Sequence, residues 1–268
     1  MEKLIILTPS IARPEMHSIV FDKLINNFLK NVKIPIVWLI NIDKNKNKTM
    51  YNKNIIKTNI SQEFTKNNIL KYLNKLKNIT AVFNLSEKSG FWEATKYLME
   101  KSIDYINNKT GILWFEDDWI LSRDLDLQDI IDKYYTDNCY ISLQCNELTF
   151  PPFIIGTHFY RKFLHIIDSI NSDPKFPEND FIDPENVFRF SMYKILHDEK
   201  ISIYNFLVNY DEKCIDNLFS QKENMFLNSF GLNKSRKVKA YLNKNNKSFF
   251  ITKNLNINYK SKIEKINS

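Results

Sequence analysis

The sequence predicts an α/β fold, with one domain in which a central, mainly parallel sheet is flanked by helices. Short apolar segments of strand length alternate along the chain with longer segments in which apolar residues recur at helical spacing. Polar loops follow the expected strands, and parallel sheets bind their ligands beyond the carboxyl ends of the strands. The chain has 268 residues, which is enough to bury a sizeable core.

The first 120 residues carry this alternation most clearly. We expect strands where apolar residues run together, at 3–8, 34–42, 54–60 and 79–84, and again from Gly111. Helices are expected at 62–76 and 89–106, and another opens at Pro14, because proline is favoured in a first helical turn. Residues 8–15 contain two prolines, so we expect a loop there.

The rest of the chain is more irregular. Helices are expected near 127–135, 159–170 and 185–196, and strands at 140–144 and 201–206. Pro151 and Pro152 mark a break, and a loop punctuated by prolines spans 173–184. We assign residues 1–231 to one domain, with halves at 1–120 and 121–231, and residues 232–268 to a basic tail.

The positive charge is concentrated in this tail. The whole chain carries +7 and residues 232–268 carry +9, so residues 1–231 sum to −2. A nearly neutral body with a basic tail fits contact with phosphates or an anionic membrane surface better than a nucleic-acid-binding face. A solvated tail without a partner is the alternative.

Cysteine usage and hydropathy bear on the cellular compartment. The three cysteines show no CxxC spacing, which predicts reduced thiols rather than a disulfide framework or a zinc site. The apolar stretch at 4–7 is too short for a signal peptide, and no segment has the roughly 18 apolar residues of a membrane span. We therefore expect a soluble, cytoplasmic protein.

Three consecutive carboxylates, Glu116, Asp117 and Asp118, follow the apolar run that begins at Gly111. Like charges at the end of a buried strand repel one another and lose hydration, so a cation is the natural partner. A hard divalent metal held by one or two carboxylates and substrate phosphates fits this pattern. The alternative is a solvated turn in which Asp118 caps the next segment.

Four segments support the metal interpretation by their order: the loop at 8–15, residues 84–94, the acid triplet, and residues 153–162. Together they resemble the GT-A glycosyltransferases, in particular family 2-like nucleotide-sugar transferases, with Glu116 in place of the first Asp of the DxD motif. The resemblance spans roughly the first 200 residues. It implies a Rossmann-like GT-A domain that moves a sugar from a nucleotide donor, UDP in particular, to a hydroxyl of a glycan, protein or lipid.

The resemblance implies a donor site formed by Thr8, Pro9, Arg13, Asp43, Lys88, Gly90, Glu116 and Asp117. Arg13 would approach the base or diphosphate as a forked donor, and Asp43 would accept a hydrogen bond from uracil or ribose. Asp118 and Glu116, with His197 as a further candidate, would bind Mn²⁺ or Mg²⁺, which offsets charge on the departing diphosphate. Because Glu is one methylene longer than Asp, Glu116 would support the metal or contact the ribose.

For the acceptor, the resemblance and the nearby aromatic residues indicate Trp92, Gly156, His158 and Tyr160. Aromatic rings stack on pyranoses, although core packing is their commoner fate and is what we expect of Trp119. An inverting enzyme would also need a carboxylate that takes the proton from the acceptor hydroxyl. Asp183 and Glu185 are the candidates, and Asp183 before Pro184 also makes an ordinary helix N-cap.

Two other functions remain open from the sequence. A sugar nucleotidyltransferase can share the parallel sheet and paired acids, but it usually has a glycine-rich loop after the first strand, and residues 8–15 contain no glycine. A non-catalytic protein that binds polyanions through its basic tail is the second possibility.

Overall fold

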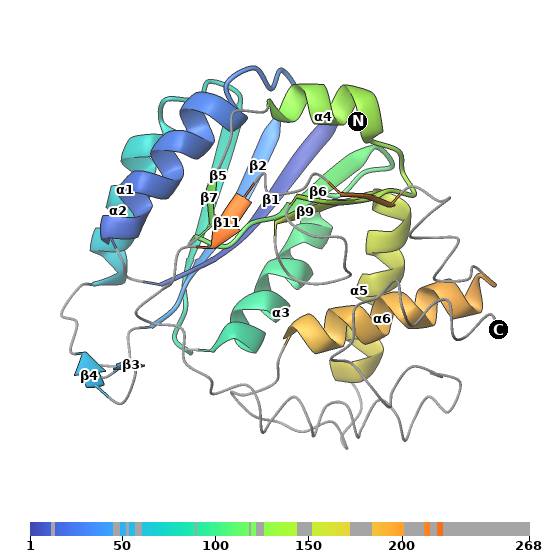
Figure 1. Ribbon diagram of the computed structural model, residues 1–268. Coiled ribbons are helices and arrows are strands. Elements are labelled where there is room, and N and C mark those ends of the chain that lie inside the picture. Colours follow the sequence, from blue (N-terminus) through green and yellow to red (C-terminus); the bar gives the residue numbers. More distant parts are fainter. Residues whose placement is uncertain are drawn as a thin grey trace.

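The computed structural model describes residues 1–11, 14–44, 49–51, 54–56, 61–88, 90–117, 119–121, 126–143, 152–171, 184–200, 212–214 and 219–221. These residues form an α/β fold in which a sheet lies between two layers of helices (Figure 1). The predicted fold class is confirmed.

The central sheet has seven strands in the order β10-β8-β9-β6-β1-β2-β5. Their bounds are Lys3–Ser10 for β1, Ile36–Ile42 for β2, Ile79–Leu85 for β5, Thr110–Trp114 for β6, Tyr140–Ser142 for β8, Phe153–Ile155 for β9 and Glu212–Cys214 for β10. Strands β6, β1, β2 and β5 are mutually parallel, and β10 is parallel to β8. Strand β9 runs antiparallel to both of its neighbours, so the sheet is mixed but mainly parallel.

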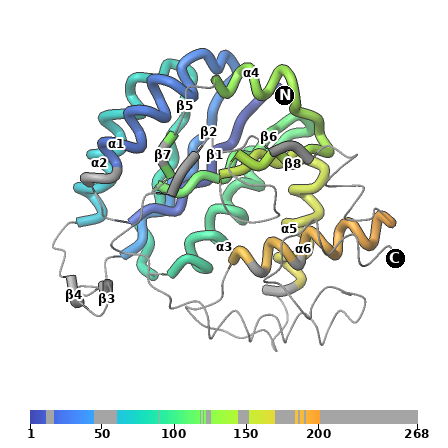
Figure 2. The backbone as a smooth tube through the Cα atoms, in the orientation of Figure 1, coloured from blue at the N-terminus to red at the C-terminus, as the bar shows by residue number. Residues whose placement is uncertain are grey.

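Helices cover both faces of the sheet (Figures 1 and 2). One layer contains α1 (Pro14–Lys23), which continues into a π-helical turn η1 (Leu24–Phe28), together with α2 (Gln62–Leu73) and α4 (Leu127–Tyr134). The other contains α3 (Phe91–Ser102), followed by a 3₁₀ turn η2 (Ile103–Tyr105), and α5 (Thr157–Asn171) and α6 (Pro184–Asp198). Among the described residues, no helix is both long and apolar enough to cross a membrane.

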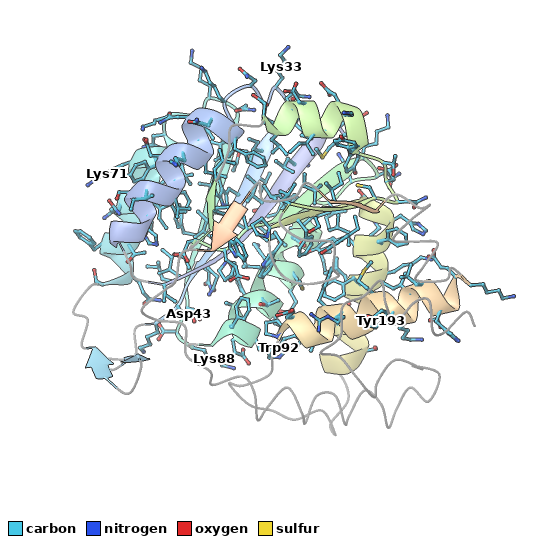
Figure 3. The ribbon with its side chains drawn as sticks, in the orientation of Figure 1. Lys33, Asp43, Lys71, Lys88, Trp92 and Tyr193 are labelled. Atoms are coloured by element: carbon cyan, nitrogen blue, oxygen red, sulfur yellow. The ribbon has the colours of Figure 1, made fainter. Side chains whose placement is uncertain are left out.

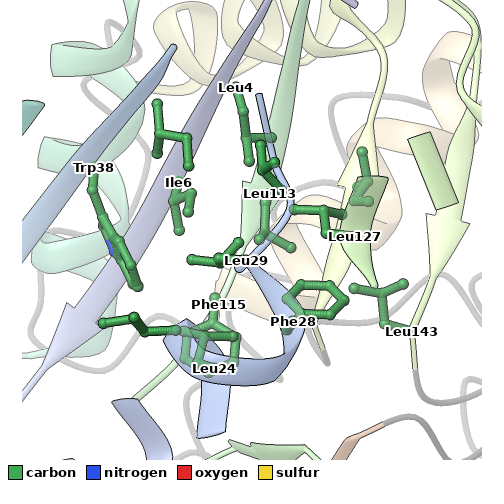
Figure 4. Close-up of a cluster of buried hydrophobic side chains, with 14 of the residues drawn as sticks. Leu4, Ile6, Leu24, Phe28, Leu29, Trp38, Leu113, Phe115, Leu127 and Leu143 are labelled. Atoms are coloured by element: carbon green, nitrogen blue, oxygen red, sulfur yellow. The ribbon is translucent and has the colours of Figure 1, made fainter. Parts of the chain in front are cut away.

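The apolar runs of the sequence explain why the sheet is central. From Leu4 to Ser10, every residue of β1 is buried, as is typical of a parallel strand covered on both faces. Successive residues point to opposite faces, so Leu4 and Ile6 pack under α1 and η1, whereas Ile5 and Leu7 pack towards α3 and α5. Figure 4 shows the first of these two clusters.

Local capping sets where the helices begin. The Ser61 hydroxyl accepts from the Phe64 N–H at 3.1 Å at the start of α2, and the Asp126 carboxylate accepts from the Gln128 N–H at 2.7 Å at the start of α4. Helix α3 begins after Gly90, whose φ of 137° lies in the region that favours glycine.

Several element bounds differ from the predictions. Strand β1 continues to Ser10 instead of ending at Thr8, and includes Pro9. Proline has no N–H to donate, but Pro9 faces the β6 side of β1, where pairing with β6 has already ended at Leu7. The strand is therefore longer than the two prolines in 8–15 suggested.

The expected strand at 54–60 is corrected as well. Its described part is β4 (Asn54–Ile56), which pairs antiparallel with β3 (Thr49–Tyr51) outside the central sheet. A second small ribbon joins β7 (Trp119–Leu121) to β11 (Phe219–Gln221). The expected strand at 201–206, the tail at 232–268 and residues 173–183 of the expected loop at 173–184 lie outside the described residues, whereas Pro184 begins α6.

Candidate active site at the carboxyl edge of the sheet

The carboxyl ends of β1, β2, β5 and β6 gather most of the predicted donor-site residues. The register aligns Ser10 of β1 with Ile42 of β2, and Ile42 with Leu85 of β5, so the loops after these strands leave from one edge. Figure 3 shows Asp43, Lys88 and Trp92 at this edge. We call this edge the site edge, because parallel sheets usually bind their ligands there.

The middle acid of the triplet, Asp117, is completely buried. Its Oδ2 atom accepts a hydrogen bond from the Ser10 hydroxyl at 2.6 Å and one from the Ile11 N–H at 3.3 Å, and it lies 2.7 Å from His17 Nε2. These contacts attach the end of β6 to the end of β1 and to α1. The expected role of Asp117 in donor binding is therefore corrected, because its carboxylate binds the protein's own donors.

Sequence reasoning did not single out His17, which is fully buried beside Asp117. Its Nδ1 atom has no hydrogen-bond partner among the described residues, and Nε2 is the ring nitrogen that meets the Asp117 carboxylate. No sequence signal marked it, since a single histidine in an apolar helix face has no distinctive spacing.

Asp43 holds a polar network that spans β2, β5 and the start of α3. Its Oδ2 accepts from the Gly90 N–H at 2.9 Å, and its Oδ1 accepts from Asn41 Nδ2 at 2.9 Å. Asn84 Nδ2 in turn donates to Asn41 Oδ1 at 2.6 Å. The carboxylate is half-buried, so its position is fixed while part of it still faces solvent. Asn41 and Asn84 were not predicted, although amides at the ends of two apolar strands were a visible signal.

The loops after β2 and β5 are also tied together. Gln62 Nε2, at the start of α2, donates to the Ile42 carbonyl at 2.7 Å and to the Ser86 carbonyl at 2.9 Å. The side chain of Lys88 remains 74% exposed, with Nζ 3.7 Å from a carboxylate oxygen of Glu93. An exposed cation at this edge is available to an anionic ligand.

Glu116 stands at the end of β6 and is partly buried. Its Oε1 accepts from Trp114 Nε1 at 3.3 Å, and its carbonyl accepts from the Trp119 N–H at 3.3 Å. Asp118 lies outside the described residues. The described residues contain no group of three or more His, Cys, Asp or Glu side chains placed to hold a metal. The donors at this corner are nevertheless carboxylate oxygens, which suit Mg²⁺ or Mn²⁺.

The other residues of the first donor loop are placed differently from the prediction. Thr8 is fully buried, and its hydroxyl accepts from Trp38 Nε1 at 2.9 Å. Pro9 is buried within β1. Both therefore stabilise the sheet, which corrects their expected role in donor binding, and Arg13 lies outside the described residues.

Two predicted acceptor residues belong to the core. Trp92 is 4% exposed and Tyr160 is 2% exposed, and both pack in the cluster between the sheet, α3, α5 and α6. The Tyr160 hydroxyl lies 2.9 Å from Ser102 Oγ, which donates to the Met99 carbonyl at 2.6 Å. These side chains pack inside the protein, which corrects their expected contact with an acceptor.

The direction of β9 shows that the remaining two predicted acceptor residues, Gly156 and His158, lie away from the site edge, which corrects that prediction. Because β9 is antiparallel to β6, its last residue pairs with Ile112 and its first with Trp114, so Gly156 and His158 lie at the edge opposite the site edge. A Cβ at Gly156 would overlap the backbone of Asp137, which explains the glycine by packing. His158 Nε2 lies 3.0 Å from Glu199.

Helix α6 carries two further candidates. His197, predicted as a metal ligand, lies in the last turn of α6, two residues before the Glu199 that contacts His158 at the opposite edge, which corrects that prediction. Glu185 lies at the start of α6, a helix that contacts α3, and its carboxylate accepts from Arg189 at 2.6 Å. Glu185 remains a candidate, and Asp183 is outside the described residues.

No protein-family model and no curated protein matches the chain. Solved structures that resemble it include S. aureus TarS, which is 13% identical with a TM-score of 0.49 and covers 100% of this chain and 48% of its own. Mouse xyloside xylosyltransferase 1 is 8% identical with a TM-score of 0.43 and covers 84% of this chain and 99% of its own.

A mannosyltransferase of Pyrobaculum calidifontis, in complex with GDP-Man and Mn²⁺, is 6% identical with a TM-score of 0.44 and covers 81% of this chain and 55% of its own. The chain spans about half the length of the TarS chains that it matches, 48% of one and 54% of another.

Proposed function

We propose that this protein is a metal-dependent glycosyltransferase that moves a sugar from a nucleotide-sugar, UDP-linked in particular, to a hydroxyl of a glycan, protein or lipid. One observation supports the proposal: Asp43, Gly90 and Glu116, which come from three separate loops, lie at the same carboxyl edge of the parallel strands. Such an edge is where open α/β sheets bind ligands.

Asp43 is the proposed contact for the nucleoside. Its carboxylate is held by Asn41 and Gly90, so it is already oriented before a ligand arrives, which lowers the entropy cost of binding. A carboxylate can accept from the N–H of a pyrimidine or from ribose hydroxyls. Lys88, exposed in the loop before Gly90, supplies a positive charge for the diphosphate.

Glu116 and Asp118 would hold the metal, whereas buried Asp117 anchors the segment between them. When bound, the metal would offset the negative charge that develops on the leaving diphosphate. The contact between Glu116 and Trp114 orients the carboxylate, so this residue enters the site in a defined position.

Glu185, with Asp183 as the alternative, is the proposed general base. A base must reach the acceptor hydroxyl and remove its proton as the new bond forms. The Glu185 side chain is 38% exposed, and its pairing with Arg189 one turn along α6 holds the carboxylate in a defined position.

Thermal unfolding tests the function. We expect UDP with Mn²⁺ to raise the melting temperature of the wild-type protein, because a ligand at 100 times its Kd stabilises the folded state by about 2.7 kcal/mol. The Asp118→Ala variant should lose this shift. Asp104→Ala is the matched control, since Asp104 is exposed after the far end of α3, and it should keep the shift.

A result in which no nucleoside diphosphate stabilises the wild-type protein with Mn²⁺ or Mg²⁺ would contradict the proposal.

Deletion of residues 232–268 separates the function of the tail from that of the domain. We expect the truncated protein to keep its response to UDP even if it no longer binds polyanions.

A further inference from the structure

Two adjacent aromatic residues open α3, and they differ in exposure. Trp92 is 4% exposed and packs in the core, whereas Phe91 is 37% exposed. The backbone of this first turn is fixed, because Thr95 Oγ1 donates to the Phe91 carbonyl at 2.7 Å and Gly90 donates to Asp43. Phe91 is therefore a large apolar side chain held at the site edge by a rigid backbone.

The Phe91 ring lies towards the end of β6. Its centroid is 6.2 Å from that of Trp114, with the two rings tilted by 55°. Trp114 is the last residue of β6, and its indole N–H donates to Glu116. The backbone just before Phe91 is hydrogen-bonded to Asp43 after β2, and the contact with Trp114 brings the Phe91 ring to β6, the strand that leads to Glu116.

We propose that Phe91 is the stacking platform for the transferred sugar of the nucleotide donor. This inference rests on the proposed function. If Asp43 contacts the nucleoside and Glu116 helps to hold the diphosphate through the metal, then the sugar follows the diphosphate near Glu116, and the Phe91 ring lies beside Trp114, the residue whose indole contacts Glu116. Aromatic rings pack against the C–H face of a pyranose, while nearby carboxylates accept from its hydroxyls.

The ligand class is thus a nucleotide-linked hexopyranose with an apolar ring face, and the platform is Phe91 rather than Trp92. A nucleobase could also stack on an exposed ring. The contact of the Phe91 ring with Trp114, whose indole donates to Glu116, favours the sugar.

Calorimetric titration in the presence of Mn²⁺ tests the assignment, with UDP and four UDP-hexoses as probes: UDP-glucose, UDP-galactose, UDP-N-acetylglucosamine and UDP-N-acetylgalactosamine. We expect Phe91→Ala to raise the Kd of the UDP-hexose that the wild type binds best by about tenfold, and that of UDP by less than about twofold. Phe91→Tyr, which keeps the ring, should stay within about threefold of the wild type for both probes.

Ile103→Ala is the matched control, because Ile103 is an exposed apolar residue just past the other end of α3. It should leave every Kd unchanged. Equal weakening of UDP and the UDP-hexoses by Phe91→Ala would assign the ring to the base and overturn the proposal. No weakening of either would overturn it too. If the wild type binds no nucleotide with metal, the proposed function itself fails, which is a different outcome.

Discussion

His17 Nε2 lies 2.7 Å from Asp117 Oδ2, and both side chains are fully buried. The contact joins residues 100 positions apart in the sequence and fixes helix α1 against the end of β6. Ser10 donates to the same carboxylate oxygen. The end of β1, helix α1 and the segment after β6 are therefore held together at Asp117, the residue that follows Glu116.

Replacing Asp117 by alanine should cost about 3 to 5 kcal/mol of unfolding free energy, because His17, Ser10 and the Ile11 N–H would lose their common acceptor in the interior. Urea unfolding measures this loss. Glu116→Ala, a neighbouring acid that is partly exposed, should cost less than about 1 kcal/mol. Similar losses for the two variants would contradict the anchoring role of Asp117.

The Asp43→Asn variant should weaken UDP binding about tenfold. Asn41 and Gly90 each donate to one oxygen of Asp43, and an asparagine offers one oxygen and one NH₂ group, so one donor would face another donor. The Gly90 loop would then shift, together with the contact proposed for the nucleoside. Calorimetric titration with UDP and Mn²⁺ measures the change, and Asp104→Asn, after the far end of α3, serves as control. Unchanged UDP affinity in Asp43→Asn would remove Asp43 from the site.

The site edge could be predicted from the sequence because apolar runs locate parallel strands and their ends. Asp43 and Glu116 follow such runs, and both lie where the pattern places them. What the pattern does not encode is the partner of a buried side chain. Thr8 faces Trp38 and Asp117 faces His17 because of tertiary packing, and no local spacing distinguishes these residues from ligand-binding ones.

Strand direction was the second property that the sequence did not reveal. The three residues of β9, Phe153–Ile155, are apolar in either direction, and only their pairing with β6 shows that they run antiparallel. The reversal moves Gly156 and His158 to the edge opposite Glu116. A short apolar run thus identifies a strand without identifying which edge of the sheet its following loop reaches.

Tyr160→Phe should lower the unfolding free energy by about 1 kcal/mol and leave the binding of UDP-hexoses unchanged. Burial raises the pKa of Tyr160, so its hydroxyl stays protonated and donates to Ser102 in the core. Urea unfolding and calorimetric titration measure the two quantities on the same variant. Weaker binding of a UDP-hexose without loss of stability would return Tyr160 to the list of ligand contacts.

Glu100, on α3, is a carboxylate whose environment favours the neutral form. Partial burial raises the pKa of Glu100 above its usual 4.5, and the nearby carboxylates of Asp168 and Glu93 raise it further, whereas Lys96 lowers it. The folded state therefore binds this proton more tightly than the unfolded chain does. Its contribution to stability is lost as the pH rises through the raised pKa.

Glu100→Gln should consequently be more stable than the wild type at pH 7, by a few tenths of a kcal/mol for a partly exposed group. Well below pH 4.5 the two proteins should be equally stable, because Glu100 is then protonated in both the folded and the unfolded wild type. Glu2→Gln is a control whose unfolding free energy should change in the opposite direction, because a hydrogen bond from Lys109 lowers the pKa of Glu2. That variant should be the less stable one at pH 7, and its deficit should also vanish in acid. Urea unfolding at several pH values measures both differences, and a Glu100→Gln gain that persists at low pH would show that its cause is not ionisation.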